Sequence, residues 1–435
     1  MRKYFSILIA AVLLCTFAGA AADPIQVTML KSAGGNDTNI ELWRHLVEEF
    51  EEWTDGKYTL ALEEIPGVAV DVRTKLKMLN AANHLPALVS DLSAEPAFAD
   101  LLISNDRLLD MSEAFAADEQ WKSTAFETSI AFNTSEDGAM YTSPAVYTQY
   151  VGIFYNKELL AQVGYETFPE TWEEFWDLCN KLKEAGIAAL SLHTTETGWC
   201  PMLLATAYAA TASEEGAAFL RENFPSDFNN DAMVDMITML RKLFDYTTSD
   251  AIGGTYSLAA NNFCTGKTAM IANGPWMIDS LYDTQYSPEG FAEKVGYATF
   301  PEHLMLCDEG EVYGYGISKD VSEEEQAGAI EFLKFLALPE VISEFTVTMG
   351  SMSNLVELTQ ETLDQLSPMM QEYADAVSQT TVTAPRYQAK WDSVVQTEVI
   401  EQELPNLVQD IITPEEFVTK MTEGAQRYLS ETAGQ

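Results

Sequence analysis

The turn Gly274-Pro275-Trp276 is the part of the sequence best suited to hold another molecule. Glycine and proline favour a fixed turn geometry, and a tryptophan on such a turn can present the flat face of its indole to a ligand. Large aromatic side chains also commonly fill protein cores. The local sequence therefore leaves two roles open for Trp276, which are ligand stacking and core packing.

Patterns of catalytic and metal-binding sites are weak in this chain. Residues 261–268 end in Gly-Lys-Thr, as a phosphate-binding loop does, but Asn261 stands where that loop needs glycine, and the preceding segment is expected to be a helix. No Gly-x-Ser-x-Gly nucleophile elbow is present. The four histidines are dispersed, and the spacing of His193 and Cys200 fits no common zinc pattern. We therefore expect no nucleotide, metal or other cofactor. A carboxylate pair for glycoside hydrolysis stays open, because glutamates are abundant and nothing singles out one pair.

The size and charge of the chain limit its partners. The 435 residues are too many for one ordinary core and sufficient for two lobes. Asp and Glu number 67 against 24 Lys and Arg, which gives a formal net charge of −43. Such an excess repels phosphate backbones and anionic lipid, so we expect no nucleic acid and no membrane surface as a partner.

The N-terminus predicts export. Residues 1–22 begin with two basic residues, continue with an apolar run and end with small residues, which is typical of a secretory signal peptide cleaved near Ala20 or Ala22. The apolar run is too short to serve well as a membrane-spanning helix. Cys15 lies inside the apolar run, so no lipid anchor is expected. We expect a periplasmic or extracellular protein, in which disulfides are permitted but cannot be paired from sequence.

The first part of the mature chain alternates strands and helices. Expected strands cover Pro24–Leu30, Tyr58–Ile65 and Pro86–Val89, with helical patterns between them. This alternation predicts an α/β fold with a mostly parallel sheet. Ligands of such sheets bind at the carboxyl ends of the strands. Asn36 and Asp37, in the loop after the first strand, are thus candidate ligand contacts, or else they are turn formers and helix caps.

Several motifs in order along the chain resemble one family. They are Gly152–Leu160, Pro169–Phe175, Phe263–Met270, Asn273–Trp276, Gly314–Lys319 and Ala329–Leu336. Together with the signal peptide, this ordered set resembles the extracellular sugar-binding proteins of bacterial ABC importers, the family that includes maltose-binding protein. The resemblance covers essentially the whole mature chain.

The resemblance implies a two-lobed α/β fold of the periplasmic-binding-protein type (type II), in which the chain crosses three times between the lobes. We expect crossings near Tyr141–Ala145, Val295–Ala298 and Met349–Ser353. The expected first lobe is residues 23–143 plus 297–349, and the expected second lobe is residues 144–296 plus 350–435.

The family's role implies a non-catalytic, monomeric substrate-binding subunit. It would hold a carbohydrate in the cleft between hinged lobes, close on it, and deliver it to a membrane permease driven by an ATPase. Two alternatives stay open. The first is the same role for a polyamine, a glycerophosphodiester or a peptide, and the second is a secreted glycoside hydrolase.

The resemblance also assigns aromatic site residues. Trp276 matches the stacking tryptophan of the family's Gly-Pro-Trp turn. Trp391 precedes an apolar helical stripe and falls where relatives carry a second stacking aromatic. Trp199, after the expected strand Ile187–Leu192, is a further aromatic candidate, for which a structural role is an equal alternative.

Three polar residues complete the expected site. Gln149 lies just past the first crossing, where relatives often place a polar ligand contact, and its amide can both donate and accept hydrogen bonds. Asp91 and Glu95 lie in the loop after the third strand, where relatives bond sugar hydroxyls. For Asp91 and Glu95 a structural role is an equal alternative.

Overall fold

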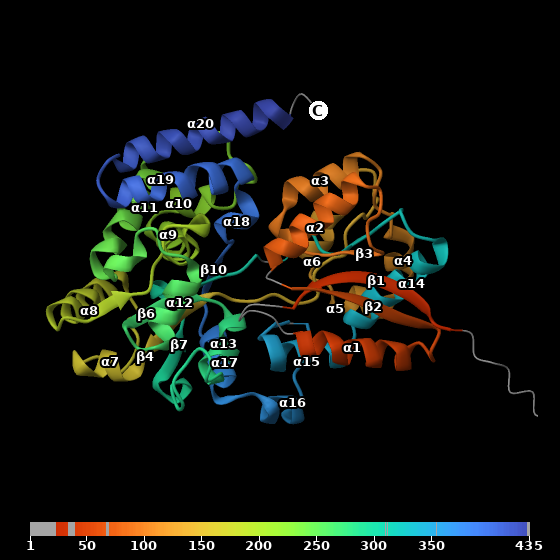
Figure 1. Ribbon diagram of the computed structural model, residues 1–435, viewed down its shortest axis with the longest axis horizontal. Helices are drawn as coiled ribbons and strands as arrows, with labels where there is room; N and C mark the ends of the chain where they lie inside the picture. Colours follow the sequence, from red (N-terminus) through yellow and green to blue (C-terminus); the bar gives the residue numbers. More distant parts are fainter. Residues whose placement is uncertain are drawn as a thin grey trace, which may run out of the picture.

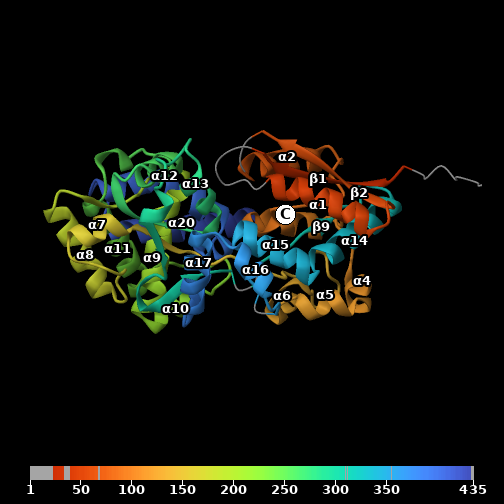
Figure 2. The same cartoon turned by 90° about the horizontal axis from the view of Figure 1, so that it is seen from below.

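The chain forms two α/β lobes that lie side by side along the longest axis of the molecule (Figures 1 and 2). The computed structural model describes residues 23–33, 40–66, 69–308, 310, 312–353 and 355–432. Each lobe has its own four-stranded sheet. The two-lobed α/β fold predicted from the sequence is confirmed.

The first lobe is built on the parallel strands β1 (Ile25–Ser32), β2 (Tyr58–Ile65) and β3 (Leu88–Val89). β9 (Gly316–Ile317) returns from much later in the chain and pairs antiparallel with β3. Helices pack on this sheet because its apolar residues need cover. The helices are α1 (Ile40–Trp53), α2 (Ala69–Ala81), η1 (Leu92–Ala94), α3 (Pro96–Ser104), α4 (Ser112–Ala117), α5 (Glu119–Thr124), α6 (Glu127–Asn133), α14 (Glu323–Leu336) and α15 (Pro339–Met349).

The second lobe has β4 (Gly152–Asn156) between β6 (Thr268–Asn273) and β7 (Val295–Ala298), both antiparallel to it. β5 (Ala188–Leu190) pairs parallel with β6, whose residues are all buried because helices cover the sheet. The covering elements are α7 (Lys157–Gln162), α8 (Trp172–Glu184), η2 (Glu196–Gly198), α9 (Trp199–Ala212), α10 (Glu214–Phe219), α11 (Asp231–Leu243), η3 (Phe244–Tyr246), η4 (Ser249–Ala251), α12 (Tyr256–Cys264), η5 (Pro275–Met277), α13 (Ile278–Tyr282), η6 (Ala292–Lys294) and η7 (Pro301–His303).

After α15, the chain first packs α16 (Gln360–Gln365) against α15 and then adds elements to the second lobe. A two-stranded parallel sheet joins β8 (Leu304–Leu306) to β10 (Val382–Ala384). α20 (Pro414–Thr432) packs against α11 and lies along the outside of this lobe (Figure 1). The remaining elements are α17 (Pro368–Ser378), α18 (Tyr387–Lys390), the π-helical η8 (Val394–Ile400) and α19 (Glu401–Val408).

The segments that connect the lobes lie beside one another. Thr142 forms an antiparallel bridge with Gly316, and Thr148 forms one with Met352. Val151 also pairs with Leu306 at the start of the second lobe. The connections are therefore short extended strands that support one another through backbone hydrogen bonds.

One expected crossing needs correction. β7 was expected to leave the second lobe, but it pairs with β4 inside that lobe's sheet. Leu304 and Leu306 of β8 belong to the same hydrophobic cluster as Val151. The chain therefore returns to the first lobe after Leu306, because a short apolar strand does not reveal in sequence which sheet it will join. The remaining lobe boundaries stay predictions.

Two expectations about export can be compared with the described residues. No disulfide joins the four cysteines of the described chain, and all four are buried: Cys179, Cys200, Cys264 and Cys307. Within the described ranges, no helix combines the length and the apolar character that a membrane span requires. The expected signal peptide lies outside the described residues.

Candidate functional site

The two lobes meet where α18 of the second lobe lies against η1 of the first. η1 directly follows β3, so the carboxyl end of a parallel strand faces this boundary. α18 follows β10 and also contacts α9. The boundary therefore brings together loops from both lobes, at the place where α/β sheets bind ligands.

Trp276 lies at this end of the second lobe, in η5 immediately after β6. The side-chain oxygen of Asn273 accepts a hydrogen bond from the backbone N–H of Gly274, and Pro275 starts the short helix. The Trp276 indole then folds back over Gly274, where an added Cβ would lie 2.3 Å from the ring. Only glycine fits beneath this ring, so the Gly-Pro-Trp turn fixes the orientation of the indole.

Trp199 joins Trp276 in an aromatic corner. Their ring centroids are 6.2 Å apart and their planes are tilted by 49°. Both rings are half-buried and pack on the hydrophobic clusters below them. The structure thus brings together two of the three tryptophans predicted for the site, and we name this pair the indole pair.

An ion pair that sequence reasoning missed lies beside the indole pair. Arg386 and Asp308 each stand two residues after their strands, β10 and β8, which are parallel and in register. The Nε atom of Arg386 donates to Oδ1 of Asp308 over 3.0 Å, and a second nitrogen binds Oδ2. The guanidinium carbon lies 6.0 Å from the centre of the Trp199 ring. Burial alone would lower the pKa of Arg386, but the neighbouring carboxylate raises it.

Gln149 lies on the first connecting segment and is half-buried. Its amide nitrogen donates to the backbone carbonyl of Met349 over 2.8 Å. The side chain thereby ties the first connecting segment to the end of α15. A ligand contact of Gln149 stays a prediction.

In the first lobe, Asp91 follows β3 with a left-handed backbone, φ 59°. Lys31, near the end of β1, feels the charge of Asp91, and its ammonium lies 4.3 Å from the centre of the Trp43 ring. Burial lowers the pKa of Lys31, and the charge of Asp91 partly opposes this effect. Glu95 instead forms ion pairs with Lys77 and Arg73. Asn36 and Asp37 lie outside the described residues.

Trp391 lies in a different environment from the one expected. Only 1% of its surface is exposed, and its ring meets Phe228 edge-on at 5.0 Å and packs against Tyr387. The carboxylate of Asp392 accepts backbone hydrogen bonds from Val394 and Val395, which sets the chain so that Trp391 turns inward. The expectation of a stacking role is therefore corrected, because Trp391 is a core residue of the second lobe.

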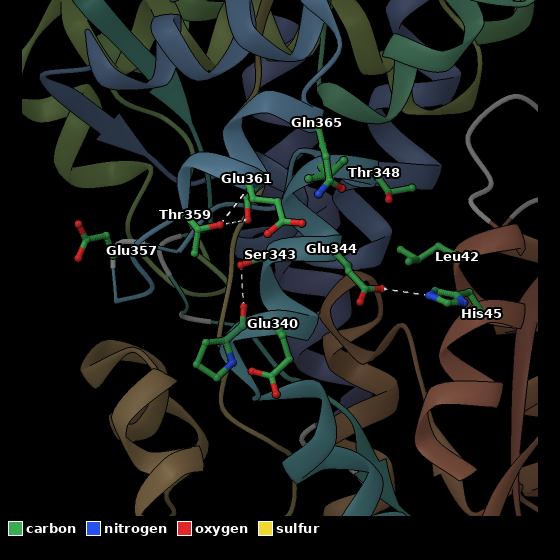
Figure 3. Close-up of a pocket in the computed structure, with 13 residues that line it drawn as sticks. Leu42, His45, Glu340, Ser343, Glu344, Thr348, Glu357, Thr359, Glu361 and Gln365 are labelled. Atoms are coloured by element: carbon green, nitrogen blue, oxygen red, sulfur yellow. Dashed lines mark hydrogen bonds and ion pairs between the residues drawn. The ribbon is translucent and has the colours of Figure 1, made fainter. Parts of the chain in front are cut away.

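A separate pocket of about 720 Å³ lies between α1, α15 and α16 (Figure 3). Its described lining includes four glutamates and no lysine or arginine, and it contains none of the predicted site residues. At its edge, Nε2 of His45 lies 3.2 Å from Glu49 and 4.0 Å from Glu344. Burial and the charge of Glu49 raise the pKa of Glu344 to about 7. The donor atoms of these three side chains lie within 4.8 Å, a spacing that a divalent cation could bridge.

Comparisons with known proteins agree with this architecture. A family model described as "Bacterial extracellular solute-binding protein" matches residues 45–376. A "Probable sugar-binding periplasmic protein" of Rhizobium meliloti (strain 1021) is 25% identical over 282 residues, which are 63% of this chain and 64% of that protein. The match thus spans slightly less than two thirds of the relative's length.

Two solved structures share the fold. A chitin oligosaccharide binding protein superposes with a TM-score of 0.74 at 22% identity, over 93% of this chain and 99% of the other. A Streptococcus pneumoniae solute-binding protein in complex with the blood group A-trisaccharide gives a TM-score of 0.71 at 18% identity, over 92% and 100% of the two chains.

Proposed function

Because the chain belongs to the family of bacterial extracellular solute-binding proteins, we propose that it is the substrate-binding subunit of an ABC importer and that its ligand is a carbohydrate. The observation that carries the proposal is the indole pair at the boundary between the lobes. Pyranose rings have apolar C–H faces that stack on indole rings. The relative named as sugar-binding and the two oligosaccharide-binding neighbours support the same ligand class.

Polar groups at the boundary would supply specificity. Sugar hydroxyls need planar side chains that form several hydrogen bonds, and Asp91, Gln149 and the Arg386–Asp308 pair are of this kind. When the lobes close, these groups lose their water. A hydroxyl that is missing from the ligand would then cost about 1–3 kcal/mol, because its partner stays buried and unpaired.

The charges beside the indole pair argue against the other ligand classes. A polyamine would need a free carboxylate, but the carboxylate of Asp308 is already paired with Arg386 near the Trp199 ring. A phosphorylated ligand would need a free cation, but the charge of Arg386 is balanced by Asp308. A neutral sugar avoids both problems.

We further propose that the ligand is released unaltered. Glycoside hydrolysis needs two carboxyl groups on either side of the scissile bond, one of them protonated. Asp308, the carboxylate beside the indole pair, has both oxygens bound by the guanidinium of Arg386 and so is already occupied by a partner. The exported chain would act as a monomer and pass its sugar to the permease subunits.

A thermal-shift screen with neutral oligosaccharides tests the proposal. The protein without residues 1–22 is mixed with maltose, raffinose, xylobiose, N,N′-diacetylchitobiose or, for comparison, spermidine, and the sugar mixtures are later analysed for cleavage. A ligand that binds only the folded state raises the melting temperature. We expect a clear shift with at least one sugar, recovered intact. A shift with spermidine alone, or the appearance of cleavage products, would refute the proposal.

A further inference from the structure

The side chain of Gln388 is the least explained polar group near the lobe boundary. Its amide oxygen and nitrogen are both buried, and within the described part of the chain neither has a hydrogen-bond partner. The backbone carbonyl of the same residue does have a partner, since it accepts a hydrogen bond from the side chain of Gln396 over 3.2 Å. A buried amide with both ends unpaired is unfavourable in a folded protein and calls for an explanation.

The position of Gln388 in the fold offers an explanation for its unpaired amide. It lies in α18, which contacts η1 of the first lobe and α9 of the second. Its neighbours are part of the wall around the indole pair. Arg386 lies near the Trp199 ring, and the Tyr387 hydroxyl donates to the carbonyl of Thr197, just before α9. The helix that carries Gln388 thus lies at the boundary where a ligand held between the lobes would bind.

We propose that Gln388 is a specificity-determining residue that binds two neighbouring hydroxyl groups of a neutral sugar. This inference rests on the proposed function. Oε1 accepts a hydrogen bond from one hydroxyl, and Nε2 donates one to the next. A carboxylate or phosphate ligand offers only acceptors and would leave Oε1 unpaired. An ammonium ligand offers only donors and would leave Nε2 unpaired. A vicinal diol satisfies both atoms.

Two variants separate ligand binding from a structural role. Gln388→Met keeps the length of the side chain and removes both polar atoms, whereas Gln388→Glu keeps the shape and removes the donor. We expect Gln388→Met to raise the Kd for the tightest-binding sugar of the panel by about 10- to 100-fold. The melting temperature without sugar should stay equal or rise, because an unpaired buried amide is removed. Gln120→Met, at an exposed position of α5, is the matched control and should change neither value.

Deoxy analogues of the same sugar provide a second readout. Removing one of the contacted hydroxyls should weaken binding to the wild type and have little further effect on Gln388→Met, because the partner is already absent. If Gln388→Met fails to fold, the same comparison is made with Gln388→Glu.

The outcomes distinguish this inference from the function on which it rests. If the wild type binds a sugar and the Gln388 variants bind it equally well, the inference is overturned and the proposed function stands. The inference is also overturned if every deoxy analogue weakens binding to Gln388→Met as much as it weakens binding to the wild type. If no sugar of the panel binds the wild type while spermidine does, both are overturned.

Discussion

The indole rings of Trp199 and Trp276 lie 6.2 Å apart with their planes tilted by 49°. Trp199 begins α9 and Trp276 follows β6, so two separate parts of the second lobe build one aromatic corner. A tilted pair offers two apolar faces at an angle, which suits a ligand with more than one ring or with a bent shape.

Replacing either ring should weaken sugar binding. We expect Trp276→Ala and Trp199→Ala each to raise the Kd by about 10- to 100-fold, because the stacking surface is lost. Both rings are half-buried rather than central to a core, so the fold should persist. Isothermal titration gives the affinity and circular dichroism checks the fold. Trp53→Ala, at an exposed position of α1, is the control. Unchanged affinity in Trp276→Ala would contradict the site assignment.

Gly274→Ala should displace the Trp276 indole. An added methyl group would lie 2.3 Å from the ring, while the backbone, with φ −102°, tolerates alanine. We expect a loss of affinity close to that of Trp276→Ala with little loss of stability. In a double-mutant cycle, adding Gly274→Ala to Trp276→Ala should have almost no further effect, because both changes act through one side chain. Additive losses would show that Gly274 acts in another way.

The local features of this corner were accessible from the sequence, and the long-range ones were not. The turn around Trp276 depends on three consecutive residues, so its geometry could be predicted. The Arg386–Asp308 pair depends on β8 pairing with β10, and no local pattern shows that two late strands are neighbours. The same limit explains why β7 was expected to lead into the first lobe although it joins the sheet of the second.

Trp391 shows a different limit. An aromatic residue before an apolar stripe can face either the core or the cleft, and the choice depends on the exact phase of the following helix. Here that helix begins with the π-helical segment Val394–Ile400, whose wider turn does not follow the usual helical period. The sequence pattern therefore located the residue but predicted the wrong environment for it.

Trp391→Ala should destabilise the protein and leave any remaining folded fraction able to bind. Removing a fully buried indole costs about 3–5 kcal/mol of unfolding free energy, since a large cavity remains. Trp391→Phe keeps part of the packing, and we expect it to bind sugar with wild-type Kd despite a lower stability. Urea unfolding and titration calorimetry measure the two properties. A folded Trp391→Phe variant with strongly weakened binding would show that the ring contacts the ligand.

His193 should make the protein sensitive to acid. Its Nε2 accepts a hydrogen bond from the backbone of Cys200 in α9, so Nδ1 carries the proton that is donated to the carbonyl of Thr195. Burial lowers the pKa of this imidazole from 6.5 to about 4. The unfolded chain therefore binds a proton more readily than the folded one between these values. The stability contributed by neutral His193 is present above pH 6.5 and is lost as the pH falls through 4.

The contribution can be isolated by comparing variants. Between pH 6.5 and 4 the unfolding free energy of the wild type should fall by on the order of 3 kcal/mol more than that of His193→Gln, because the glutamine amide cannot titrate in this range. Urea midpoints at several pH values measure the difference. His84→Gln, at an exposed position, should follow the wild type. Parallel pH profiles of the wild type and His193→Gln would refute this role.

The most direct test of the account is a crystal structure of the protein with the tightest-binding sugar of the panel. The account predicts an intact sugar at the boundary between the lobes, with a ring stacked on Trp276 and Trp199. A sugar bound instead in the pocket between α1, α15 and α16, or a cleaved sugar in either place, would contradict it.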